Sequence, residues 1–191
     1  MKKLLFAGAL AALALSFSLG GCETMPTDHA KMHTSMWAGV TRAVAVLQPT
    51  KGSSVAGAIW FDAVPDGVHV HGTVTGLPPN STHGFHIHQF GDASSDDGTA
   101  AGGHYNPDNH PHGDPADGPH HAGDLGNITA DASGKATVDV TVKGVSIAGM
   151  NDPLIGRGVV LHASPDDLKT QPTGNAGARV AVGVIGVAET P

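Results

Sequence analysis

The feature that most constrains the fold is a series of eight short segments, rich in valine and partly alternating between apolar and polar residues. Turn residues such as Gly52, Pro65, Gly67 and Pro78 separate these segments. Short strands at this spacing are typical of antiparallel sandwiches and barrels. The segments are 41–48, 54–64, 67–77, 83–90, 125–131, 135–142, 156–163 and 179–188. We therefore expect one all-β domain over residues 40–191.

Two long polar loops, 91–123 and 164–178, interrupt the series. A loop as long as the first, inside a compact domain, is usually either functional or disordered. Its end overlaps the stretch DNHPHGDPADGPHHAGDLGN (108–127), which holds four histidines and four aspartates. The whole chain has 13 histidines and one cysteine, which favours metals that accept imidazole and carboxylate over thiolate sites.

The N-terminal segment has the pattern of an export signal. Lys2 and Lys3 precede an apolar stretch, 4–19, that is short for a membrane span. The following LGGC (19–22) resembles the cleavage motif of bacterial lipoproteins, so we expect Cys22 to become the lipidated first residue. The alternative is an ordinary secretory signal with an incidental cysteine.

Lipidation at Cys22 would divide the chain into a lipoprotein signal peptide (1–21), a tether (22–39) and the β domain. Two or more acyl chains hold a protein stably at a membrane surface. We expect a lipid-anchored protein of the bacterial cell envelope that faces the periplasm or the exterior. Loss of the two signal lysines changes the formal charge from −7 to −9, which argues against nucleic-acid binding.

Two His-x-His pairs, His69/His71 and His86/His88, lie in expected strands, where residues i and i+2 share a face. Spacing alone does not choose between these pairs as metal ligands. The first pair runs into Gly72 with no other ligand near it in the sequence, so we expect solvent-facing side chains. The second pair leads directly into the histidine-rich loop, and we expect it to bind metal.

From His86 onward, six ordered motifs resemble copper–zinc superoxide dismutase, and the resemblance extends over about residues 40–189. The motifs are GFHIHQFGD (84–92), GGHYNP (102–107), HGDP (112–115), HAGDLGNITAD (121–131), IGRGVVLHASPDDL (155–168) and TGNAGARVAVGVIGVA (173–188). The resemblance implies an eight-stranded Greek-key β-sandwich or barrel of immunoglobulin-like type. It also implies one copper and one zinc ion per subunit.

The family pattern carries over position by position to a complete ligand set. The resemblance implies copper ligands at His86, His88, His104 and His162. It implies zinc ligands at His104, His112, His121 and Asp124, so that His104 bridges the two metals. His83 matches a family histidine that packs beneath the site without binding metal, whereas His110 and His120 match no ligand.

The same resemblance implies the reaction and two catalytic groups. Superoxide would be disproportionated to dioxygen and hydrogen peroxide, with His104 taking up and returning a proton. Arg179 matches the family arginine that attracts the anion, although an arginine that merely caps a surface loop is the alternative. Asp166 matches the carboxylate that accepts hydrogen bonds from His86 and His112. Lys169 is a further hypothesis for steering the anion, testable by the salt dependence of the Lys169→Gln rate.

The chain departs from the family at its disulfide. Gly98 and Val182 stand where family members have paired cysteines, and Cys22, the one cysteine, is far away in the sequence. No intrachain disulfide is possible, and loss of a native disulfide typically costs about 2–5 kcal/mol. Bound metal is one source of compensation.

The oligomeric state and the function each leave an alternative open. Six residues match the apolar interface of the eukaryotic-type dimer, which favours a homodimer over a monomer. They are Phe90, Gly91, Ile155, Gly156, Val184 and Val187. The function expected is a superoxide dismutase that protects the cell envelope. The alternative is a non-catalytic copper- and zinc-binding envelope lipoprotein.

Overall fold

A computed structural model describes residue 37 and residues 39–190. The expected signal peptide (1–21), Cys22 and most of the expected tether therefore lie outside the described residues. The strands are β1 (Arg42–Pro49), β2 (Ala56–Val64), β3 (Gly67–Thr75), β4 (Thr82–His88), β5 (Asp124–Thr129), β6 (Ala136–Lys143), β7 (Gly158–His162), β8 (Arg179–Val184) and β9 (Gly186–Val187). No helix among these residues is long and apolar enough to cross a membrane.

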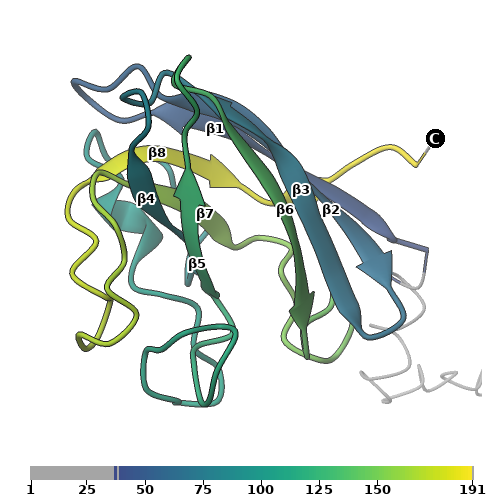
Figure 1. The fold of residues 1–191 in the computed structure, drawn as a ribbon. Helices are drawn as coiled ribbons and strands as arrows, with labels where there is room; N and C mark the ends of the chain where they lie inside the picture. The colour runs from purple at the N-terminus through teal and green to yellow at the C-terminus, as the bar shows by residue number, and fades with distance from the viewer. Residues whose placement is uncertain (1–36, 38, 191) are drawn as a thin grey trace, which may run out of the picture.

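The strands form a nearly closed antiparallel barrel in the order β5-β4-β7-β8-β1-β2-β3-β6 (Figure 1). One wall contains β4, β5, β7 and β8, and the other contains β1, β2, β3 and β6. The end of β1 joins the walls by pairing with β8. The expected all-β class and the expected eight strands are thus confirmed.

The last expected strand, 179–188, differs in detail because it is divided at Ile185. The amide of Ile185 donates to the carbonyl of Arg157, and the amide of Gly156 donates to the carbonyl of Ile185. Beyond this point the chain leaves β8 and pairs with β1 as β9. The segment therefore contributes to both walls, which an apolar-polar pattern alone does not reveal.

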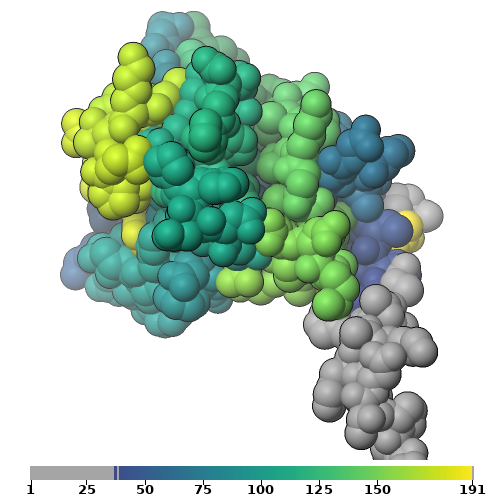
Figure 2. Space-filling view, turned by 90° about the horizontal axis from the view of Figure 1, so that it is seen from below, coloured from purple at the N-terminus to yellow at the C-terminus, as the bar shows by residue number. Residues whose placement is uncertain are grey.

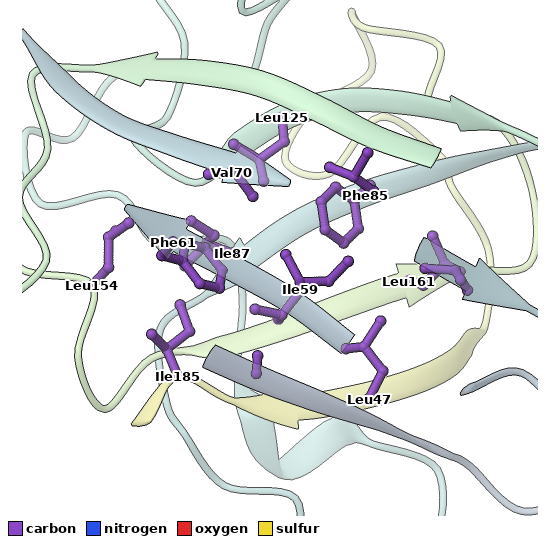
Figure 3. Close-up of a cluster of buried hydrophobic side chains, with 14 of the residues drawn as sticks. Leu47, Ile59, Phe61, Val70, Phe85, Ile87, Leu125, Leu154, Leu161 and Ile185 are labelled. Carbon is purple, nitrogen blue, oxygen red and sulfur yellow. The ribbon is translucent and has the colours of Figure 1, made fainter. Parts of the chain in front are cut away.

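The apolar core lies between the two walls (Figure 3). Ile59 and Phe61 of β2 face Phe85 and Ile87 of β4, and all four side chains are fully buried. Because strand side chains alternate, inward placement of Phe85 and Ile87 turns His86 and His88 to the outer face of β4. The alternation thus decides on which surface the functional histidines lie.

The two polar loops cover this outer face. In Figure 2 the teal and green loop of residues 91–123 lies between the yellow 164–178 loop and the light-green segment before β7. The first loop contains one short 3-10 turn, Thr99–Ala101, which the sequence did not predict. The loops bury His86 and His88 to 0% and 1% relative exposure. They therefore make a closed site from residues that would otherwise face solvent.

Candidate metal centre

The first histidine cluster contains His86, His88, His104 and His162. β4 supplies the first two, and β7 ends at His162, which follows the inward-facing core residue Leu161. A single β-bridge between His88 and His104 brings the long loop against β4. One nitrogen from each of the four imidazoles lies within 4.8 Å of the others. The cluster therefore offers four imidazole ligands from three separate segments.

The second cluster shares His104 and adds His112, His121 and Asp124. Asp124 Oδ1 lies 2.7 Å from His104 Nδ1, 3.1 Å from His112 Nδ1 and 3.3 Å from His121 Nδ1. A tetrahedron with zinc–ligand distances of about 2.0–2.1 Å has edges of about 3.3 Å. Three imidazoles and one carboxylate at this spacing fit a zinc ion.

Four buried imidazole nitrogens test whether these clusters fit metal ions. His86 Nδ1, His104 Nε2, His112 Nδ1 and His121 Nδ1 have no hydrogen-bond partner. Buried polar atoms in proteins nearly always have a partner, and a metal ion is the partner that suits several converging lone pairs. Each unpaired nitrogen belongs to one of the two clusters. Imidazole-only coordination suits copper, and the mixed set suits zinc.

Four other nitrogens of the cluster histidines are held by hydrogen bonds to protein groups outside the two clusters. Asp166 bridges two of them, with Oδ2 2.7 Å from His86 Nε2 and Oδ1 3.0 Å from His112 Nε2. His88 Nδ1 lies 2.9 Å from the Gly102 carbonyl. His162 Nδ1 lies 3.1 Å from a carbonyl of the second loop. Such contacts orient the imidazoles and leave the opposite nitrogen free for metal.

Two supporting residues were missed by sequence reasoning. The Gln171 side chain bonds both the amide and the carbonyl of His112, at 2.8 Å each. Asn127 bonds the Asp166 carbonyl and amide at 2.9 and 2.8 Å. Their amides carry no pattern that would have identified them. Gly174 also supports the site, since a Cβ there would lie 1.7 Å from Asp166 Oδ1 at a backbone φ of +66°.

Arg179 opens β8 and is the cross-strand partner of His162. Its guanidinium donates hydrogen bonds to the Gly98 and Gly102 carbonyls, so it is fixed between the first loop and the first histidine cluster. A shallow cleft beside Arg179 is also lined by Lys51, whereas Lys169 is exposed and does not line this cleft. The structure therefore places Arg179, but not Lys169, beside the four imidazoles.

Three further histidines among the described residues, His83, His110 and His120, lie outside both clusters. His83 is buried, with Nδ1 2.8 Å from the His162 carbonyl and Nε2 2.6 Å from Ser81 Oγ. His110 is exposed and contacts the His120 carbonyl at 3.3 Å, while His120 contacts the neighbouring carbonyl of His121. Proximity in sequence to His112 and His121 therefore does not bring His110 or His120 to a ligand position.

Burial and hydrogen bonding set the pKa values of the metal-free site. Burial lowers the pKa of His86 to about 4 and that of His162 to about 3, and it lowers the pKa of His88 as well. Burial raises the pKa of Asp166, but hydrogen bonds from His86, the Leu168 amide and His112 outweigh it and lower this pKa to about 2. The imidazoles of His86, His88 and His162 are therefore neutral at pH 7, as metal ligands must be.

We expect the free energy of unfolding of metal-free protein to fall as the pH is lowered from about 6.5 to 4. The unfolded chain protonates His86 and His162 near their ordinary pKa of 6.5, whereas the folded chain protonates them at about 4 and 3. The unfolded state thus binds more protons in this window, and stability rises with pH there. Each histidine contributes on the order of 1 kcal/mol per pH unit. Urea unfolding at several pH values measures the slope, and a flat profile between pH 7 and 4 would contradict it.

Comparison with known proteins agrees with this geometry. The family model for copper/zinc superoxide dismutase matches residues 55–185. An extracellular superoxide dismutase [Cu-Zn] of Brugia pahangi is 40% identical over 174 residues, which cover 85% of each chain. A crystal structure of the clock protein EA4 matches with a TM-score of 0.70 and 43% identity, over 78% of this chain and 95% of that chain. The chain belongs to the copper/zinc superoxide dismutase family.

Proposed function

We propose that this protein disproportionates superoxide to dioxygen and hydrogen peroxide at a copper site joined to a zinc site through His104. The observation that carries this proposal is the position of His104, which belongs to both clusters: its Nδ1 contacts Asp124 of the second cluster, and its Nε2 has no hydrogen-bond partner. Both sites are complete, and Arg179 lies beside the first one. The family match independently supports the activity.

The proposed copper ligands are His86, His88, His104 and His162, and the proposed zinc ligands are His104, His112, His121 and Asp124. When bound, copper would exchange single electrons with superoxide, and the positive charge of zinc would fix the position of the His104 imidazole. His104 Nε2, which has no hydrogen-bond partner, is the atom at which the chain takes up and returns a proton. The Arg179 guanidinium, whose position the two loop carbonyls fix, attracts the small anion.

A direct assay separates this enzyme from a non-catalytic metal-binding protein. Protein loaded with one copper and one zinc per chain should consume superoxide catalytically, and His162→Gln should lose copper and activity together. His110→Gln is the matched control, because His110 is exposed, lies outside both clusters and undergoes the same substitution. Stoichiometric metal binding without turnover would favour the binding protein instead.

We also propose that this is a form of the family without the intrachain disulfide. Cys22 is the one cysteine of the chain, and Gly98 packs directly against Val182. A Cβ at Gly98 would lie 2.6 Å from Val182 Cγ2, so the valine side chain fills the space between loop and strand. The Arg179 hydrogen bond to the Gly98 carbonyl supports the same loop. Packing and hydrogen bonds thus connect the first loop to β8 here.

The proposed location is the bacterial cell envelope, with a lipid anchor at Cys22. Support comes from the signal pattern and from the Brugia pahangi relative, whose name places that protein outside the cell. We expect Cys22→Ala to move the protein from the membrane to the soluble fraction without reducing its superoxide consumption. Fractionation of cells that express each form measures this. Equal membrane retention of both forms would contradict lipidation.

We further propose a homodimer through an apolar surface formed by the end of the β4–β7–β8 wall together with β9. Phe90, Val184 and Val187 are 50%, 41% and 54% exposed, although they are large and apolar. A Cβ at Gly91 would lie 2.4 Å from the Gly156 carbonyl and 2.8 Å from Val184 Cγ1, so Gly91 packs directly against both residues. Ile155 is partly buried beside it. Phe90→Glu should shift the protein toward monomer in sedimentation equilibrium, and a monomeric wild type would contradict the proposal.

A further inference from the structure

A third group of metal-type ligands lies on the opposite wall of the barrel, remote from the copper and zinc clusters. It consists of Asp62 on β2 and the two histidines of β3, His69 and His71. Phe61, Val68 and Val70 point into the core, so the three polar side chains share the outer face of the sheet. One ligand atom from each residue lies within 4.8 Å of the other two.

Strand register explains this convergence. Asp62 is the direct cross-strand partner of His69, and His71 follows His69 on the same face. The two imidazoles stack with centroids 4.8 Å apart and planes inclined by 18°. Asp62 Oδ2 lies 2.7 Å from His71 Nε2. A paired sheet therefore presents two imidazoles and a carboxylate as a preformed set.

Neighbouring side chains fix two of these three ligands. Asp139 Oδ1 on β6 lies 2.7 Å from His69 Nε2. In metal sites, a carboxylate in this position commonly orients the imidazole so that its other nitrogen can bind the metal. Arg42 Nε lies 3.1 Å from Asp62 Oδ1, which leaves Oδ2 facing His71. The Arg42 charge opposes a cation, so this site should fill only after the two buried clusters.

We propose that Asp62, His69 and His71 form a separate surface site for a divalent transition cation such as Zn²⁺ or Cu²⁺. Two imidazoles and one carboxylate suit these ions. The side chains of Asp62, His69 and His71 are 35%, 36% and 32% exposed, so an ion can reach them from solvent and keep water in its remaining positions. The chain's net negative charge of −7 favours cation approach.

The test uses full-length holoprotein whose content of one copper and one zinc per chain has been verified. The background carries His29→Gln and His33→Gln, so that histidines near the N-terminus cannot supply ligands. Titration with Zn²⁺ in a calorimeter should reveal one additional equivalent. His69→Gln with His71→Gln should weaken this binding by at least about tenfold, and Asp62→Asn should weaken it less.

Thr73→Gln is the matched control, because Thr73 is exposed on the same face of β3 and the substitution introduces the same side chain. It should leave the additional binding unchanged. Superoxide consumption should be the same in all of these variants, which verifies that the two buried clusters remain loaded. Absence of an additional equivalent would overturn the proposal, as would equal affinity in the double variant. Additional binding that occurs only when His29 and His33 are present would overturn it as well.

Discussion

Removal of both metals should lower the free energy of unfolding by at least about 4 kcal/mol, whereas dithiothreitol should leave the holoprotein unchanged. Four buried imidazole nitrogens lose their ligand partner in the apoprotein, and each unsatisfied buried polar group costs about 1–3 kcal/mol. The apoprotein also loses the ion that connects His104, His112 and His121 within the long loop. Binding to a site absent from the unfolded chain contributes directly to folding stability.

Guanidinium unfolding of holoprotein, apoprotein and zinc-reloaded apoprotein measures this effect. Zinc alone should restore a large part of the lost stability, because it connects loop 104–121 to the start of β5 at Asp124. Equal unfolding midpoints for apoprotein and holoprotein would contradict the expectation. A midpoint lowered by dithiothreitol at constant metal content would contradict the claim that no disulfide contributes.

Asp166→Asn should weaken zinc binding by about 10–100-fold while leaving the fold intact. The carboxylate accepts from His86 Nε2 through one oxygen and from His112 Nε2 through the other. An amide has one acceptor oxygen, so one of the two imidazoles would face an NH₂ donor instead. The orientation of one ligand histidine would then be lost in a fully buried position.

Competition with a chromophoric chelator measures zinc affinity in this variant, and circular dichroism verifies the fold. Asp167→Asn is the matched control, because the Asp167 side chain is exposed and bonds only the Lys169 amide and Thr170 in a local turn. The control should retain zinc. Unchanged zinc stoichiometry and affinity in Asp166→Asn would show that Asp166 does not position His112.

The strands were predictable because each has its own local signal. Alternation of apolar and polar residues identified β2, β3 and β6, and turn residues marked their ends. Ile185, where the chain passes from one wall to the other, was not predictable. That change depends on pairing with Arg157 and β1, which are distant in sequence.

The metal ligands were predictable from the sequence, but the residues that support them were not. Six ordered motifs implied all seven ligand positions, and the structure brings those residues into two clusters. Gln171 and Asn127 could not be found in the same way, because a lone amide side chain has no distinctive spacing. Their roles arise only when the second loop folds over His112 and Asp166.

The sequence by itself determined the β class, the ligand residue types and the presence of one cysteine. Tertiary structure decided which histidines converge. His110 and His120 lie within two residues of ligand positions, yet loop geometry keeps them outside the clusters. His69 and His71 had no ligand near them along the chain, and β2–β3 pairing brings Asp62 beside them. Metal coordination requires atoms within a few ångströms in space, and in a sheet the nearest side chains come from neighbouring strands.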